Sequence, residues 1–298
     1  MKKKLLFIIN PKSGLRKSLK VFNRFKSKIN NLGFSYKLII TEHQGHAEAI
    51  IQNMPLSEYD RLIIMGGDGT INEVLSGLNQ CNKLEATNIA IIPTGSGNSV
   101  MHDLNLLEID KAFNVALGNN IIKIDSILAQ FDNCTKISIS IIGWGMFSQG
   151  NVLAEKLRFI GTIRYDIASI ITLLIKRSYK AELIIDENTR NDISCSFLVG
   201  CNSKHTGKGM YIAPDGGFQD GLIDFVIVED KVSRFQIANL FAKVYSGKHT
   251  ILPYVKIQKI NSFKINSNQE TFFNIDGELI KSKSVSAKVF PKSVNIYV

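Results

Sequence analysis

The chain has 298 residues, 45% of them hydrophobic and 21% charged, and its 36 lysines and arginines against 26 acidic residues give a net charge of +10. This composition excludes a disordered or fibrous protein, and the length suits two domains with substantial cores. The basic residues are scattered rather than interleaved with stacking aromatics, so we expect no nucleic acid partner.

The N-terminal segment has three lysines followed by the apolar run Leu5–Ile9, as signal peptides do. The run stops at Asn10, short of a signal-peptide core, so we expect a buried strand and a cytoplasmic location. The longest uncharged apolar stretch elsewhere, Ile167–Ile175, is too short to span a bilayer. The four cysteines show no CxxC spacing, which indicates free thiols in a reducing compartment.

The first 120 residues alternate short apolar runs with segments of helical spacing. The predicted strands are Leu5–Ile9, Tyr36–Ile40, Leu62–Met65 and Ile89–Ile92, and the predicted helices include Leu15–Leu32 and His46–Asn53. Continuous apolar strands that alternate with helices predict a doubly wound parallel sheet.

The pattern changes near Gly118 to consecutive strands. Those predicted are Ile121–Phe131, Lys136–Ile142, Ala181–Asp186, Ser194–Cys201, Ile223–Val228, Tyr254–Ile260, Phe263–Ile265, Phe272–Ile275 and Val285–Val289, with helices over Val152–Tyr179 and Arg234–Tyr245. Such a run predicts an antiparallel β-sandwich or barrel-like domain over residues 121–291. We assign residues 1–120 to the nucleotide-binding α/β domain and expect the two domains to meet at a cleft.

Small polar loops follow each predicted strand of the first domain. They contain Asn10–Gly14, Thr41, Gly66–Thr70 and Pro93–Asn98. Glycine lets the backbone approach a phosphate, and a following helix N-terminus favours negative charge. Asp68 would repel phosphate in such a turn unless it binds a metal or accepts a proton, so the loops indicate nucleotide chemistry.

Several common nucleotide and catalytic motifs are absent from the sequence. It has no GxxxxGK[ST], no GxGxxG after the first strand, no HRD and DFG pair and no GxSxG elbow. These absences exclude P-loop, dinucleotide-binding, protein-kinase and α/β-hydrolase chemistry of the usual form.

The loop set resembles the diacylglycerol kinase catalytic-domain family, and within it the sphingosine and ceramide kinase branch. The matching segments are Asn10–Gly14, Gly66–Thr70 with Glu73, Pro93–Asn98, Met210–Pro214, Asp220–Asp224 and Ile275–Glu278. The resemblance implies an NAD-kinase-like two-domain architecture whose last strand, residues 292–298, returns to the nucleotide domain. Ser99 stands where bacterial diacylglycerol kinases have an acidic residue.

The resemblance and the loops together define an ATP site. We expect it to involve Asn10, Pro11, Ser13, Gly14, Thr41, Gly66, Gly67, Gly69, Thr70, Glu73, Thr94, Gly95, Ser96, Gly97, Asn98, Arg158, Arg164 and Asp276. Phosphoryl transfer to a hydroxyl needs a proton acceptor and a hard cation. Asp68 is the candidate base, with Glu278 the second candidate catalytic residue, and Asp276 and Glu278 are the candidate Mg²⁺ ligands, directly or through water.

The middle of the chain bears on the acceptor lipid. The resemblance places Trp144 and Gln149 at the lipid substrate, although Gln149 stands where the sphingosine branch has an aspartate. Trp144 alternatively belongs to the core. Asp220 either caps a turn or binds a structural metal.

The sequence also bears on membrane contact and on alternative functions. Residues 152–180 mix apolar and basic side chains, which fits either buried core or a lipid-tail pocket with a basic rim on an anionic membrane surface. We expect a lipid kinase that is peripherally membrane-associated and leave homodimer formation open. An NAD kinase, which shares the GGDGT turn, and a non-catalytic lipid or nucleotide sensor remain alternatives.

Overall fold

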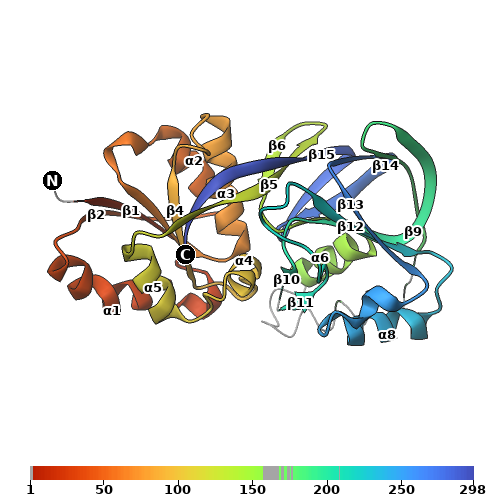
Figure 1. Ribbon diagram of the computed structural model, residues 1–298, viewed down its shortest axis with the longest axis horizontal. Helices are drawn as coiled ribbons and strands as arrows, with labels where there is room; N and C mark the ends of the chain where they lie inside the picture. The colour runs from red at the N-terminus through yellow and green to blue at the C-terminus, as the bar shows by residue number, and fades with distance from the viewer. Residues whose placement is uncertain (1–2, 157–167, 169–170, 173–174, 176, 208) are drawn as a thin grey trace. The chain divides into compact units, whose positions relative to one another are not determined.

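The computed structural model describes residues 3–156, 168, 171–172, 175, 177–207 and 209–298 (Figure 1). The chain divides into two compact units. Unit 1 contains Met1–Ser126 and Pro291–Val298, and unit 2 contains Ile127–Phe290. The predicted boundary at residue 120 therefore falls before strand β5 (Ile121–Phe131), which runs from unit 1 into unit 2.

Unit 1 is built on a parallel sheet of the order β4-β3-β1-β2. Its strands are β1 (Lys4–Ile9), β2 (Ser35–Ile40), β3 (Arg61–Gly66) and β4 (Asn88–Pro93). All six residues of β3 are buried, as are five of the six in both β1 and β4. Such continuous apolar runs are typical of strands covered on both faces.

Helices cover both faces of this sheet. They are α1 (Ser18–Asn31), α2 (His46–Asn53), α3 (Asp68–Gln80), α4 (Ser99–Asp103) and α5 (Ile109–Leu117), with short 3₁₀ turns η1 (Gly14–Arg16) and η2 (Leu56–Glu58). Phe25 of α1 stacks on Phe113 of α5 with ring centroids 3.9 Å apart. Figure 1 shows these two helices on one side of the sheet and α2 with α3 on the other. The doubly wound prediction is confirmed.

Unit 2 is predominantly antiparallel. Its elements are β6 (Thr135–Ser138), β7 (Ile141–Gly145), α6 (Met146–Lys156), β8 (Tyr179–Ile185), β9 (Thr189–Cys201), β10 (His205–Thr206), β11 (Met210–Tyr211), β12 (Ile223–Glu229), α8 (Arg234–Val244), η4 (Lys248–Ile251), β13 (Val255–Ile260), β14 (Ser262–Ile275) and β15 (Glu278–Tyr297). Both β7 and β8 pair with β9 and with β14, so these four strands close into a ring. The predicted β-rich second domain is confirmed.

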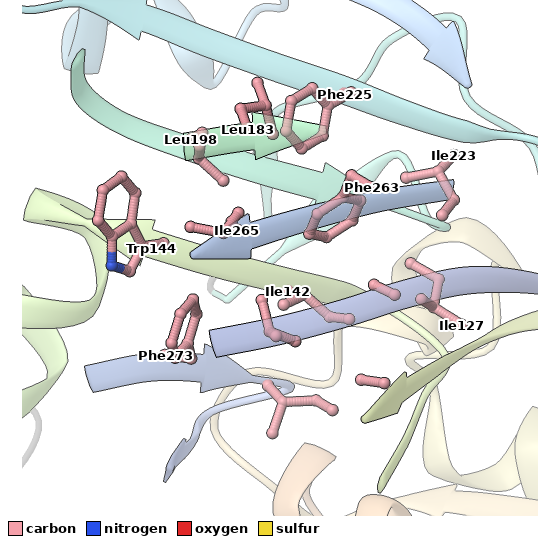
Figure 2. Packing of buried hydrophobic residues seen from close by; sticks show 14 of the residues in the cluster. Ile127, Ile142, Trp144, Leu183, Leu198, Ile223, Phe225, Phe263, Ile265 and Phe273 are labelled. Atoms are coloured by element: carbon pink, nitrogen blue, oxygen red, sulfur yellow. The ribbon is translucent and has the colours of Figure 1, made fainter. Parts of the chain in front are cut away.

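The two faces of unit 2's sheet carry separate cores. Trp144, Leu198, Phe225 and Phe273 belong to the core drawn in Figure 2. Neighbours one residue along the strands, such as Val199, belong to a second core that also contains the buried residues of α8. This division follows from the alternation of side chains along a strand.

The last strand β15 is longer than predicted, because it joins the runs 285–289 and 294–298. Its final residues belong to unit 1, where Asn295 and Ile296 pair in parallel with Asn88 and Ile89 of β4. The prediction of one strand over Lys136–Ile142 is wrong, because β6 ends at Ser138 and β7 begins at Ile141. Most of the helix predicted over Val152–Tyr179 lies outside the described residues.

Candidate active site

Three loops of unit 1 lie together at the carboxyl edge of the parallel sheet. They follow β1, β3 and β4, which are neighbours in the sheet. The backbone N–H of Asn10 donates to the carbonyl of Met65 at 2.9 Å, and that of Thr94 donates to Gly66 at 3.3 Å. Ligands of open α/β sheets bind at this edge.

Glycines allow these loops to touch through their backbones. Gly14 has φ +46°, and a Cβ there would lie 1.8 Å from the carbonyl oxygen of Thr94. A Cβ on Gly95 would lie 2.3 Å from the Cα of Gly67. No other residue fits at either position without separating the loops. Backbone N–H groups without covering side chains are the donors that bind phosphate oxygens.

Side-chain hydrogen bonds fix the loops further. Asn10 Nδ2 donates to Thr70 Oγ1 at 2.9 Å, and Ser18 Oγ donates to Thr94 Oγ1 at 2.9 Å in a buried contact. Asn98, in the left-handed region at φ 55°, accepts from the N–H of Gly95 at 3.1 Å and donates back to its carbonyl at 2.9 Å. The loop after β4 is therefore closed on itself before any ligand binds.

Asp68 is the first residue of α3 and is bonded to the start of α4. Its Oδ1 accepts from the backbone N–H of Ser99 at 2.9 Å, and its Oδ2 accepts from Ser99 Oγ at 3.3 Å. Ser99 is 3% exposed. The serine that departs from the bacterial diacylglycerol kinase pattern is thus the residue that positions the candidate base.

The remaining predicted nucleotide residues of unit 1 fall into two groups. Pro11, Ser13, Gly69, Ser96 and Gly97 lie in these loops or at the start of α3. Thr41, which follows β2, and Glu73, on α3, lie outside the three loops. The N–H of Thr41 donates to Ile9, and Glu73 Oε2 accepts from the N–H of Ala47 at 3.1 Å. Glu73 thereby links α3 to α2, which is a positioning contact.

Asp276 and Gly277 form the two-residue turn between β14 and β15. Both have positive φ, +48° and +91°, which is the signature of the type I′ hairpin that Asp-Gly favours. The Asp276 carboxylate is buried and accepts four hydrogen bonds. The donors are Ser138 Oγ at 2.7 Å and the N–H groups of Ile139, Ser140 and Ile141 at 3.0, 3.1 and 2.8 Å.

These four bonds bear on the predicted Mg²⁺ ligands. An ionised carboxylate has about four acceptor sites, and here Oδ1 accepts three of the bonds and Oδ2 accepts the one from Ile139. The bonds favour a positioning role for Asp276 on the loop between β6 and β7, and its role as a Mg²⁺ ligand, directly or through water, stays a prediction. The same bonds explain why the strand predicted over residues 136–142 is interrupted.

Glu278 fits a metal ligand better. Its carboxylate lies 3.8 Å from Lys136 Nζ, and the two side chains are 20% and 12% exposed. A partly exposed carboxylate beside an ammonium can still reach a hard cation and its waters. Among the described residues, no group of three or more His, Cys, Asp or Glu side chains is placed to hold a metal ion. Substrate phosphates would therefore have to supply further ligands.

The predicted lipid-site residues of unit 2 differ in accessibility. Gln149 is half-buried on α6, whereas Trp144 is 1% exposed in the core with its ring 6.4 Å from that of Phe273 (Figure 2). Trp144 Nε1 has no hydrogen-bond partner within the described part of the chain. The core alternative for Trp144 is therefore the one the structure supports. Arg158 and Arg164 lie outside the described residues.

Of the two alternatives for Asp220, the turn cap has support, because Oδ1 accepts from the N–H of Leu222 at 3.1 Å, while Oδ2 faces an internal cation. Lys259 Nζ lies 2.6 Å from Asp220 Oδ2, 3.2 Å from Asp224 Oδ2 and 3.1 Å from the carbonyl of Asp215. Burial raises the pKa of Asp224, which the ammonium offsets. A cavity of about 500 Å³ lies beside this ion pair and is lined by none of the predicted lipid-site residues.

Two partners in these sites were not predicted from the sequence. Ser18 sits on a helix four residues after Gly14, and Lys136 lies 142 positions before Glu278 in the chain. Neither residue belongs to a local motif. Ser99 could be found from the sequence, because it directly follows the Pro93–Asn98 segment.

Comparison with known proteins agrees with this architecture. Residues 4–129 match the diacylglycerol kinase catalytic domain, and residues 140–298 match the YegS C-terminal NAD kinase beta sandwich-like domain. No helix in the described ranges is long and apolar enough to cross a membrane.

Curated relatives match over most of their length. Sphingosine kinase 1 of Rattus norvegicus is 24% identical over 97% of this chain and 89% of its own. Diacylglycerol kinase of Staphylococcus epidermidis is 28% identical over 93% and 86%. The crystal structure of a diacylglycerol kinase from Bacillus anthracis superposes with a TM-score of 0.78 over 99% of this chain and 97% of that one, at 20% identity. The chain belongs to the diacylglycerol kinase catalytic-domain family of lipid kinases, with a YegS-type C-terminal domain.

Proposed function

We propose that this protein is an ATP-dependent lipid kinase that transfers the γ-phosphate to a hydroxyl of a diacylglycerol, sphingoid or ceramide-type lipid. The observation that carries the proposal is the arrangement in unit 1. Three glycine loops pack backbone to backbone, and Asp68 is held beside them by both donors of Ser99. The loops suit phosphates, and the carboxylate suits a hydroxyl proton.

The triphosphate would bind to backbone N–H groups near Gly14, Gly67 and Gly95. The N-terminus of α3, which begins at Asp68, adds favourable electrostatics for an anion. These donors are already fixed by the hydrogen bonds within and between the loops. Positioning and charge stabilisation supply most of the catalysis in phosphoryl transfer, so a rigid cradle is what the reaction requires.

Asp68 would then accept the proton of the acceptor hydroxyl. As that oxygen forms its bond to the γ-phosphorus, the bond from phosphorus to the bridging oxygen breaks and ADP leaves. A positioned proton acceptor typically contributes roughly 10²–10⁴-fold to the rate. The hydrogen bonds from Ser99 hold the carboxylate in position.

Mg²⁺ would neutralise charge on the phosphates, and Glu278 is the residue we assign to bind it. Asp276 supports that assignment indirectly, because it fixes the tight turn from which Glu278 projects. The further nucleotide contacts proposed for Arg158 and Arg164 rest on the family resemblance alone.

The acceptor is proposed at the level of a class. The curated relatives include both sphingosine kinases and diacylglycerol kinases at comparable identity. Gln149 stands in place of the aspartate of the sphingosine branch and removes a charge that would pair with an amine. We therefore rank an uncharged hydroxyl acceptor, as in diacylglycerol or ceramide, above sphingosine. We also propose that the protein acts on its lipid acceptor at an anionic membrane surface.

The test is transfer of labelled phosphate from ATP to a panel of acceptors. Diacylglycerol, ceramide, sphingosine, dihydrosphingosine and undecaprenol are dispersed in detergent, and NAD is tested in parallel. We expect a phosphorylated lipid and no NADP. Formation of NADP without a lipid product would favour an NAD kinase, and ATP binding without any transfer would favour a sensor; either result contradicts the proposal.

A further inference from the structure

Helix α8 has an apolar face that points away from the protein. Ile237, Leu240 and Val244 are buried in unit 2's second core. On the opposite side, the exposed apolar residues at helical spacing are Phe235, Ala238, Ala242 and, just past the helix end, Tyr245, and the uncharged Asn239 is exposed among them. The outward face of a surface helix is ordinarily polar. This helix therefore exposes an apolar stripe to solvent in addition to the one that it buries in the core.

The following turn extends the apolar surface. Phe235 is 88% exposed, Ile251 on η4 is 77% exposed and Tyr245 is 58% exposed. These are three of the eight large hydrophobic side chains exposed among the described residues, and they lie within 17 positions of one another. Pro253 is exposed beside them. We call residues 231–253 the α8 surface.

All lysine, arginine, aspartate and glutamate positions within the α8 surface are basic. Residues 231–253 contain Lys231, Arg234, Lys243 and Lys248 and no aspartate or glutamate. The acidic residues nearest in sequence directly precede it: Asp230 accepts from Ser194 and Ser178, which lowers its pKa and keeps it charged, and Glu229 pairs with Lys256 at 3.0 Å. Apolar side chains with four cations and no anion among residues 231–253 complement a surface that is anionic outside and apolar beneath.

The surface is fixed by the protein rather than formed by a loose loop. Ser233 and Gln236 form a reciprocal capping box at the start of α8. Tyr254 Oη donates to the carbonyl of Gln236 at 2.9 Å, and the buried His249 holds η4 through a 2.9 Å contact of Nε2 with the carbonyl of Ile212. Little conformational entropy would be lost on docking, which favours binding by a preformed face.

We propose that the α8 surface is where this protein docks on an anionic lipid bilayer, with Phe235, Tyr245 and Ile251 inserted at the headgroup boundary and the four cations on the headgroups. The biological sense of the docking rests on the proposed function, since a lipid kinase needs access to an acceptor held in a membrane. This surface is distinct from residues 152–180, where the sequence analysis placed a lipid-tail pocket.

The test is sedimentation of the full-length protein with vesicles that contain neither acceptor nor nucleotide. Vesicles of phosphatidylcholine with phosphatidylglycerol are compared with phosphatidylcholine alone. We expect the wild type to bind the anionic vesicles only. The double variant Phe235→Ser with Ile251→Ser should weaken this binding on the order of tenfold, and so should the triple variant Lys231→Gln, Arg234→Gln and Lys248→Gln. All five side chains are exposed, so the melting temperature should stay unchanged.

Matched controls change exposed residues elsewhere. Leu32→Ser with Leu107→Ser removes two exposed apolar side chains, and Lys20→Gln with Lys26→Gln and Lys288→Gln removes three charges. Controls that bind as wild type support the inference. Controls that weaken binding as much as the α8 variants would show general charge attraction and overturn it.

Two further readings keep the inference separate from the proposed function. If the protein phosphorylates a detergent-dispersed acceptor but does not bind vesicles, the docking surface is overturned and the proposed kinase activity stands. If it binds vesicles through the α8 surface but phosphorylates no acceptor, the docking surface stands and the proposed kinase activity is overturned. Light scattering at several protein concentrations tests the competing occupant. A dimer abolished by Phe235→Ser with Ile251→Ser would assign this face to a second copy and overturn membrane docking.

Discussion

The contact between Asp68 and Ser99 is the central residue-scale feature of unit 1. Ser99 gives both its backbone and its side-chain donor to one carboxylate, at 2.9 and 3.3 Å. An acidic residue at position 99 would place a second carboxylate at this point. The serine therefore changes the electrostatic environment of the candidate base relative to the bacterial diacylglycerol kinase pattern.

Ser99→Ala tests this positioning role. The backbone bond stays and the side-chain bond is lost, so we expect kcat to fall about tenfold with an unchanged KM for ATP, since a hydrogen bond to a charged group contributes about 1.5 kcal/mol. Ser57→Ala, at an exposed position, is the matched control. A rise in KM with unchanged kcat would assign Ser99 to nucleotide binding instead.

Asp276 and Glu278 belong to one motif but have different predicted roles. Asp276→Asn replaces an acceptor of four hydrogen bonds with a group that is half donor, so we expect unit 2 to lose about 3 kcal/mol of stability. Glu278→Gln weakens the 3.8 Å ion pair with Lys136 but leaves the loop after β6 in place, so it should cost less stability than Asp276→Asn, yet abolish transfer. Thermal unfolding and the kinase assay measure the two effects.

The opposite pattern would contradict these assignments. If Asp276→Asn melts as wild type and is inactive, its carboxylate acts on the substrate or the metal rather than on the loop after β6. The sequence could locate this motif but not its role. The donors to Asp276 lie 135 to 138 positions earlier in the chain, and no local pattern reports such a contact.

At the scale of elements, the packing of the glycine loops makes a sharp prediction. Gly95→Ala places a Cβ 2.3 Å from the Cα of Gly67, so the loops after β3 and β4 must separate. We expect a loss of about 2 kcal/mol in the stability of unit 1, together with weakened ATP binding, because overpacking costs typically 1–3 kcal/mol. Differential scanning calorimetry and a nucleotide titration measure both.

Gly69→Ala is the matched control for stability. No atom lies within 4 Å of a Cβ at that position, and alanine favours the first turn of α3. Its melting temperature should equal or exceed that of wild type. Equal destabilisation by the two substitutions would contradict the loop contact. Weaker ATP binding by Gly69→Ala without destabilisation would mark the open space as part of the phosphate site.

The elements that the sequence predicted correctly are those with strong local patterns. The strands at Leu5–Ile9 and Leu62–Met65 are continuous apolar runs, and the structure places β1 and β3 there. The break between β6 and β7 escaped prediction because the Asp276 carboxylate takes the backbone donors that would continue the strand. β14 was predicted as two strands because its middle, residues 266–271, is polar and exposed around a bulge.

At the scale of the whole molecule, the chain combines an α/β unit with a β-rich unit, and β15 ends in the first of them. Composition and the order of elements were sufficient to predict this class, because alternating and consecutive strands lead to different sheet types. The pairing of Ile296 with Ile89 could not be derived from local pattern, since 207 positions separate the two residues. That part of the prediction rested on the family resemblance.

The most direct test of the proposed mechanism is the turnover of Asp68→Asn with a lipid acceptor that the wild-type protein phosphorylates. Asparagine has the same shape and can still accept from the Ser99 N–H, so the fold and the ATP affinity should be retained. We expect kcat to fall at least about a hundredfold, while Asp110→Asn, at an exposed ion pair with Arg24, stays as wild type. Near-normal turnover by Asp68→Asn would contradict the assignment of Asp68 as the proton acceptor.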